Sequence, residues 1–268
     1  MTNQHILKTN KNLILLVFVV GGLVPTLIKL AVFSDYYQLA GVLPLFPFFA
    51  IIEYVVLASS GDKKYAKITL LITAKSMLAY LSFCLTVLIF VELEIVRNTF
   101  SVMAISALVW ILVLTLSGLL TNRRSFFIFF TSIFVLVSLL YGISTMSLRG
   151  DFYFYSLFFV FVSGGVLAVS IKISTFYRSE LTGILPLFPV FVAYQVVWLL
   201  DSGTYALKEG IIATILTAPA YVSFVIFLGW FRLGRMLNLL IGLCFYFFIL
   251  CLSFKAFEMI SQLTLTEA

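Results

Sequence analysis

Glu53 and Lys75 are the charged residues best placed to do chemistry, because both lie inside long apolar runs of this chain. Counted from the inner face of the membrane, both reach a depth of roughly 8–13 Å at about 1.5 Å per residue. An unpaired charge there costs at least about 2.5–3.5 kcal/mol, so an ion pair or a wet site is expected. Two interpretations stay open. Glu53 carries a coupling proton in a binding site, or the two residues form a structural ion pair, with Lys75 extending to the surface.

A repeated apolar word with two prolines is the second candidate site. GVLPLFPFF begins at Gly41 and GILPLFPVF begins at Gly183, 142 residues later. The prolines favour a helix start, where a missing N–H costs nothing, or a helix broken inside the membrane. A broken helix would present free carbonyls and a helix N-terminus to a buried site. The prolines concerned are Pro44, Pro47, Pro186 and Pro189.

Aligning the two copies of the repeated word adds further polar residues to the candidate site residues. Gln195 aligns with Glu53, so the charge is present in only one copy. Tyr80 and Tyr221 match within AYLSF and AYVSF, and are expected to line a cavity or to hydrogen-bond between helices. Lys29 and Lys172 also match, and extension of each ammonium to the surface competes with a transport role.

Composition restricts the class of protein. The chain has 268 residues, of which 63% are hydrophobic and 10% charged, so lipid must solvate most of its surface. The net charge of +6 is spread over loops, which disfavours nucleic acid. The one histidine, His5, lies in a polar tail, and the three cysteines have no metal or disulfide spacing. No enzyme activity, metal or cofactor is therefore expected. The cysteines are Cys84, Cys244 and Cys251.

Nine stretches are long and apolar enough to cross a bilayer as helices, so we predict an all-α polytopic membrane protein. The first run is too long for a signal peptide and contains Lys29. The predicted spans are 12–33, 41–58, 66–91, 100–120, 125–147, 152–175, 183–200, 210–231 and 235–258.

Loop charges predict the orientation, because cytoplasmic loops carry more lysine and arginine. With the N-terminus in the cytoplasm and the C-terminus outside, basic residues concentrate in the inner loops. The inner set is Lys8, Lys11, Lys63, Lys64, Lys67, Arg123, Arg124, Lys172, Arg178, Arg232 and Arg235; the outer set is Arg97, Arg149, Lys208 and Lys255. The bias fits a bacterial inner membrane.

An internal duplication explains the repeated word. Each copy supplies four helices, and a linking helix in 121–151 lies between copies 1–120 and 152–268. Because this extra crossing moves the chain across the bilayer, the second copy is expected to be upside down. Secondary transporters with inverted repeats bind substrate near the midplane.

The stretch PLFPFFAIIEYVVLASSGD resembles the GlpM family of small four-helix inner-membrane proteins, over about 80 residues of the first copy. That resemblance implies a half-size unit that assembles as an antiparallel pair, here fused, and a connection with exopolysaccharide production. It implies no catalytic residues.

These features favour a secondary transporter, or a flippase of a lipid or saccharide intermediate, working by alternating access. The alternative is a non-transporting membrane scaffold for an envelope or exopolysaccharide assembly. Expected partners are membrane lipid and a small solute or lipid-linked substrate, without nucleic acid. A homo-oligomer is compatible with the sequence.

Overall fold

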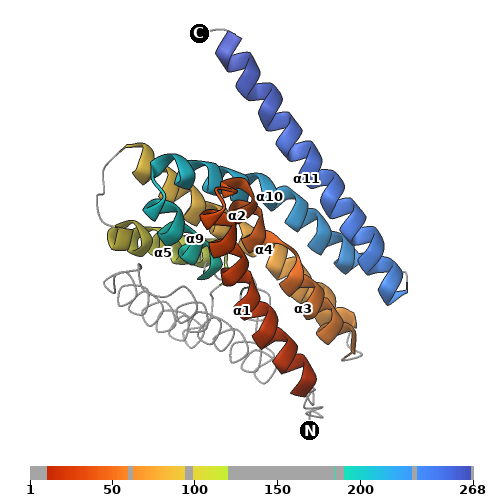
Figure 1. Cartoon of the computed structure of the whole chain (residues 1–268). Helices are drawn as coiled ribbons and strands as arrows, with labels where there is room; N and C mark the ends of the chain where they lie inside the picture. The colour runs from red at the N-terminus through yellow and green to blue at the C-terminus, as the bar shows by residue number, and fades with distance from the viewer. Residues whose placement is uncertain are drawn as a thin grey trace.

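The computed structural model describes residues 11–59, 63–93, 99–119, 184, 190–230 and 234–266, and in these every regular element is a helix. Long apolar runs form helices because a helix satisfies its own backbone groups. Figure 1 shows the arrangement. In chain order the elements are α1 (Lys11–Phe33), α2 (Tyr37–Val42), the short 3₁₀ turn η1 (Leu43–Leu45), α3 (Phe48–Ser59), α4 (Lys63–Glu92), α5 (Thr99–Leu116), α9 (Val190–Asp201), α10 (Thr204–Trp230) and α11 (Arg235–Thr266).

Helices α4 and α10 form the centre and run antiparallel side by side (Figure 1). Leu70, near the start of α4, lies against Gly229, near the end of α10, and this contact shows that the two helices run in opposite directions. Helix α5 packs on α4, and α11 packs on α10. Helices α2 and α9 also pack on α10, and α1 contacts both of them.

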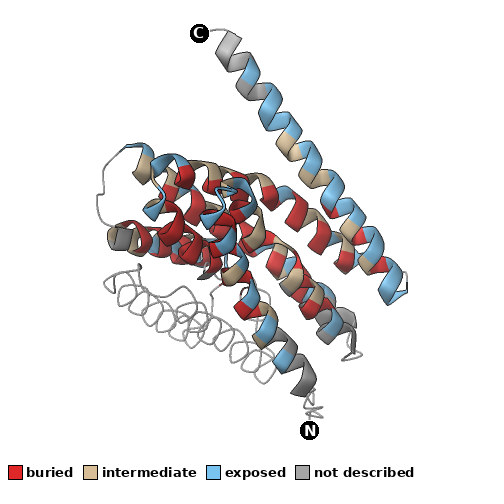
Figure 2. Ribbon diagram, in the orientation of Figure 1, coloured by how far each residue is buried: buried red, intermediate tan, exposed pale blue. Residues whose placement is uncertain are grey.

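Burial follows this arrangement. All residues from Phe191 to Leu199 of α9 are buried, and the core continues into α10 (Figure 2). Helix α11 differs, because most of its side chains are exposed and its C-terminal part extends beyond the other described helices. In an apolar chain of this kind, exposed apolar side chains are expected to face lipid.

The predicted spans agree with the helices wherever the structure describes them, with three corrections. Span 41–58 begins earlier, at Tyr37, and is broken rather than continuous. Helix α10 begins at Thr204 instead of 210, and α11 continues to Thr266 instead of 258. Spans 125–147 and 152–175 lie outside the described residues. Within the part of the chain that the structure describes, three helices are long and apolar enough to cross a membrane, in Lys67–Glu92, Thr204–Trp230 and Arg235–Met259.

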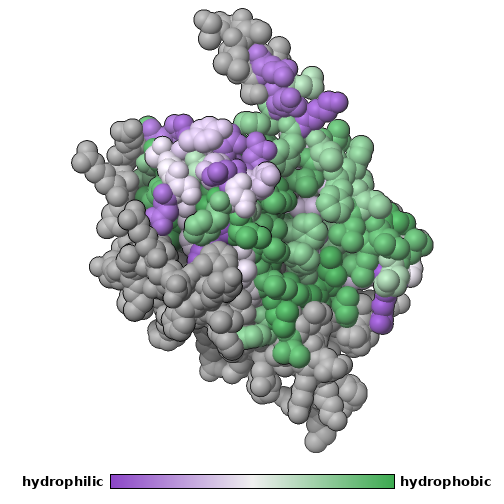
Figure 3. Space-filling view, in the orientation of Figure 1, coloured by the Kyte–Doolittle hydropathy of each residue, from purple (hydrophilic) through white to green (hydrophobic). Residues whose placement is uncertain are grey.

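Hydrophilic side chains gather at one end of the bundle, where α1 turns into α2 and where α10 begins (Figure 3). There the Gln38 amide donates to the Glu209 carboxylate at 2.9 Å, and the Lys208 ammonium lies 2.6 Å from the Glu92 carboxylate. Partly exposed ion pairs of this kind contribute at most about 1 kcal/mol. Each contact nevertheless joins α10 to an element from residues 1–120.

The turn from α1 into α2 at this polar end depends on Asp35. Its φ of 59° is in the left-handed region, which lets the Tyr36 N–H donate to the Ala31 carbonyl at 2.8 Å and close α1. The Tyr37 hydroxyl donates to the Asp35 carboxylate at 2.6 Å. That hydrogen bond is the main reason the pKa of Tyr37 is raised.

Helices α2 and α10 approach most closely where two glycines face each other. A Cβ atom at Gly41 would overlap the Gly210 carbonyl oxygen and come within 2.6 Å of the Ala213 Cβ. Because one obstacle is backbone, it cannot rotate away. The first glycine of the repeated word is therefore required for this crossing.

We predict that Gly41→Ala destabilises the protein by about 1–3 kcal/mol, the usual effect of overpacking. The matched control is Gly229→Ala, where an added Cβ would meet Leu70 only at an ordinary 3.6 Å. Thermal unfolding in detergent, followed by circular dichroism, should show a lower Tm for Gly41→Ala and an equal or higher Tm for the control. Equal Tm values for both variants would refute the close crossing.

Candidate functional site

The repeated word interrupts the helical chain in its first copy, with Pro44 in η1 and Pro47 directly before α3. Helix α2 ends at Val42, η1 follows, and Phe46 is extended with φ −62° and ψ 133° before α3 begins. Both prolines are buried. Neither can donate a backbone hydrogen bond, so the Leu43 carbonyl accepts from the Phe46 N–H at 3.2 Å instead of from residue 47.

Side chains from the last two helices bind carbonyls at this break. The Thr214 hydroxyl of α10 lies 2.9 Å from the Gly41 carbonyl oxygen, to which it donates. The Tyr246 hydroxyl of α11 donates to the Leu45 carbonyl at 3.3 Å. The rings of Tyr246 and Phe46 are also in edge contact, with centroids 5.9 Å apart. Two carbonyls at the break are thus bound by side chains of the protein, as a low-dielectric environment requires.

Gln195 extends this group to a third helix. Its side chain is fully buried on α9, and its amide donates to the Thr214 hydroxyl at 3.1 Å. Thr214 therefore accepts from Gln195 while it donates to Gly41. The Gly210 carbonyl, at 3.0 Å from the same hydroxyl, is a second acceptor for its single proton. The resulting chain of hydrogen bonds joins α9, α10 and the broken helix.

The other predicted residues lie at different places. Tyr80 and Tyr221 are buried on α4 and α10, where these helices pack together. Lys75 is exposed on α4. Glu53 lies on α3, but its side chain is outside what the structure describes, so its pairing with Lys75 stays a prediction.

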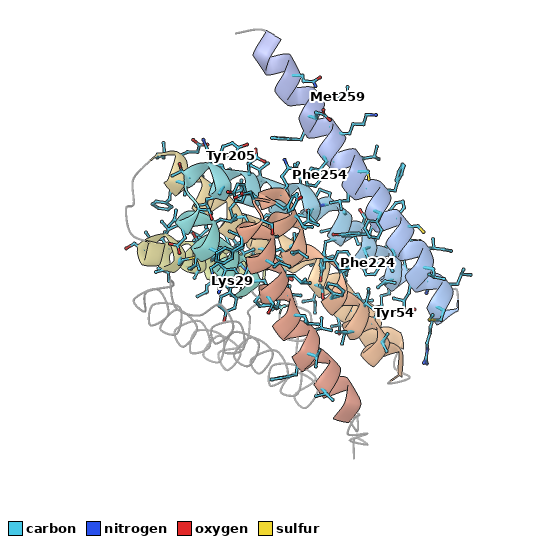
Figure 4. All side chains as sticks on the ribbon, in the orientation of Figure 1. Lys29, Tyr54, Tyr205, Phe224, Phe254 and Met259 are labelled. Atoms are coloured by element: carbon cyan, nitrogen blue, oxygen red, sulfur yellow. The ribbon has the colours of Figure 1, made fainter. Side chains whose placement is uncertain are left out.

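Lys29 differs from the expectation that its ammonium extends to the surface. It is 5% exposed on α1, and its Nζ lies 5.7 Å from the centre of the Phe33 ring (Figure 4). A cation over an aromatic face is favourable, and more so when water is excluded. The remaining candidates, Lys172, Pro186 and Pro189, lie outside the described residues.

Sequence reasoning missed Thr214, Tyr246 and Gly210. Thr214 carried one usable signal, because it lies 141 residues after Thr73, the same offset that relates AYLSF to AYVSF. Tyr246 and Gly210 carried no usable sequence signal. A tyrosine in an aromatic run and a glycine near the start of a helix are both common in membrane proteins.

Residues 16–124, which include the broken helix, match the GlpM protein family model. The resemblance expected from PLFPFF is therefore confirmed for this part, which is less than half of the 268-residue chain. Comparison with curated proteins and with solved structures gives no match. The family match and the long apolar helices together indicate an integral membrane protein.

Replacing Thr214 with valine should destabilise the protein by about 1–3 kcal/mol, because the Gly41 carbonyl and the Gln195 amide both lose a partner in a dry interior. The control is Thr217→Val on the same helix. Thr217 is equally buried, but its hydroxyl donates only to the Ala213 carbonyl of its own helix, at 2.7 Å. Chemical unfolding in detergent measures both changes. A loss for Thr217→Val as large as for Thr214→Val would mean that the hydrogen bonds to α2 and α9 add nothing.

Proposed function

We propose that this protein is a membrane transporter that moves its substrate by alternating access between two inverted halves, residues 1–120 and 152–268. The broken helix carries the proposal. Discontinuous helices near the middle of the bilayer form the binding sites of many transporters built from inverted repeats. Here the break from one half is held by side chains of the other, through Thr214 and Tyr246.

The central helices support the same proposal. AYLSF lies on α4 and AYVSF on α10, and these helices run antiparallel in contact. Two homologous bundles with opposite orientations would place their third helices in this way. The proposed orientation puts the N-terminus in the cytoplasm and the polar end of the bundle outside.

Glu53 supports coupling to a proton. The aligned residue of the other copy, Gln195, donates through its amide to Thr214. An ionised carboxyl cannot donate, whereas a protonated carboxyl can replace the amide in such a hydrogen bond. A glutamate aligned with this glutamine is thus suited to switch a contact between helices when it gains or loses a proton.

The test of alternating access is a reversible cross-link at the polar end. Gln38 and Glu209 bond to each other from α2 and α10, so the double variant Gln38→Cys/Glu209→Cys should form a disulfide that ties the halves together. Uptake into proteoliposomes is measured for three radiolabelled solutes. They are erythritol, which is neutral, glycerol 3-phosphate, which is anionic, and choline, which is cationic. We expect oxidation to abolish the uptake that the reduced variant shows.

Wild-type protein treated with the same oxidant is the control, because it retains Cys84, Cys244 and Cys251. Its uptake should not change, and reductant should restore the oxidised variant. Full uptake by a variant shown to be cross-linked would contradict movement between the halves.

A scaffold role is the second candidate, and the exposed length of α11 is the observation that favours it. The helix has 32 residues, and only 17% of its most apolar window is buried. If the protein is a scaffold, the purified protein should transport none of the three solutes. It should also co-purify with envelope-assembly proteins under mild conditions.

A further inference from the structure

The two central helices carry buried hydroxyl groups at matching positions. Three residues on α4 and three on α10 are related by the same 141-residue offset, and each is no more than 2% exposed. Their spacing of three and four residues puts each set on one helix face. The pairs are Thr73 with Thr214, Ser76 with Thr217, and Tyr80 with Tyr221.

Because the helices are antiparallel, the two sets extend in opposite directions from a common centre. Leu70 of α4 lies against Gly229 of α10, so ten residues onward along α4 and eight residues back along the antiparallel α10 bring Tyr80 and Tyr221 to a similar level, which marks that centre. Thr73 and Thr214 each lie seven residues away along their own helix, which is about 10 Å at 1.5 Å per residue. The hydroxyls therefore form a line of about 20 Å through a hydrocarbon core of about 30 Å.

Tyr80 is the residue on this line whose hydroxyl has no hydrogen-bond partner among the described residues. It is 2% exposed. A buried hydroxyl without a partner costs free energy, so its retention in an apolar interface needs a reason. A ligand that bonds to it supplies that reason.

The chemistry of the line indicates what the ligand carries. The Thr217 hydroxyl donates its proton to the Ala213 carbonyl, so the hydroxyl oxygen of Thr217 can only accept a further hydrogen bond. The Tyr80 hydroxyl both donates and accepts. Groups of this kind complement a ligand that also donates and accepts, such as an alcohol.

Charge is missing from the line. Within 73–80 and 214–221, both of which the structure describes, the one charged residue is Lys75, which is exposed. An ion at the centre would lose its hydration without gaining a counter-charge, which is strongly unfavourable. A neutral ligand avoids this cost.

We infer that this hydroxyl line binds an uncharged, hydroxyl-bearing solute as it crosses the membrane, with Tyr80 in direct contact at the centre. The inference rests on the proposed transport function and names its substrate class. Erythritol is a suitable probe, because it is neutral and carries only hydroxyl groups.

The test compares Tyr80→Phe with Tyr205→Phe in the full chain. Tyr205 is 69% exposed at the polar end of α10, so its variant controls for loss of a tyrosine hydroxyl (Figure 4). Tyr80→Phe should slow erythritol uptake into proteoliposomes by about 3- to 10-fold, the effect of one hydrogen bond. Its Tm should stay equal or rise, because no hydrogen bond of the described fold is lost. Tyr205→Phe should change neither quantity.

Three other results would overturn the inference. Wild-type protein that moves glycerol 3-phosphate or choline but not erythritol is a transporter of another substrate class, and only the inference fails. Folded wild-type protein that moves none of the three overturns the proposed function as well. If Tyr80→Phe shows normal erythritol uptake, Tyr80 does not contact the solute. If the variant lowers both uptake and Tm, Tyr80 acts through stability and not through contact with the solute.

Discussion

Backbone carbonyls inside a membrane must find a donor within the protein, and this constraint organises the structure around Gly41–Pro47. Two prolines remove N–H groups that would continue the helix, and the chain opens at Phe46. The donors come from residues far away in sequence, Thr214 and Tyr246. Local proline chemistry thus becomes a long-range connection between the two ends of the chain.

The same constraint explains why small and hydroxyl-bearing residues are found at the centre. Gly41 and Gly210 let α2 approach α10 closely enough for the Thr214 hydroxyl to reach the broken helix. Gln195 then fixes that hydroxyl from α9. Packing between lipid-embedded helices depends on such small residues and side-chain hydrogen bonds, because apolar side chains are solvated by lipid equally well.

Helix positions were predictable, because hydrocarbon permits few alternatives to a helix and the apolar runs are long. The break at residues 43–47 was predictable only as one of two outcomes. Two closely spaced prolines suit a helix start and a helix break equally, and the distinction depends on whether residues 37–42 are also helical. That stretch is six residues long and includes Gly41, a poor helix former, so it gives little indication of a helix.

The candidate site was predictable in part. Gln195 was singled out through its alignment with Glu53; Tyr80 and Tyr221, singled out through their repeated word, lie instead where α4 and α10 pack together. Thr214 was not, because a threonine in an apolar helix most often bonds to its own backbone, as Thr217 does. The approach of α2 and the hydrogen bond from Gln195 on α9 make Thr214 different from Thr217, and both belong to the tertiary structure. The burial of Lys29 likewise depends on tertiary packing, which its place in an apolar run does not reveal.

The central claim is that Thr214 holds the Gly41 carbonyl where the prolines interrupt the helix, and a thermodynamic cycle tests it directly. Pro44→Ala/Pro47→Ala restores both N–H groups, allowing the helix to continue and the Leu45 N–H to satisfy the Gly41 carbonyl. We predict that Thr214→Val costs about 1–3 kcal/mol in the natural background and well under 1 kcal/mol in the double-alanine background. An equal cost in both backgrounds would contradict the account, because the hydroxyl would then stabilise the protein independently of the broken helix.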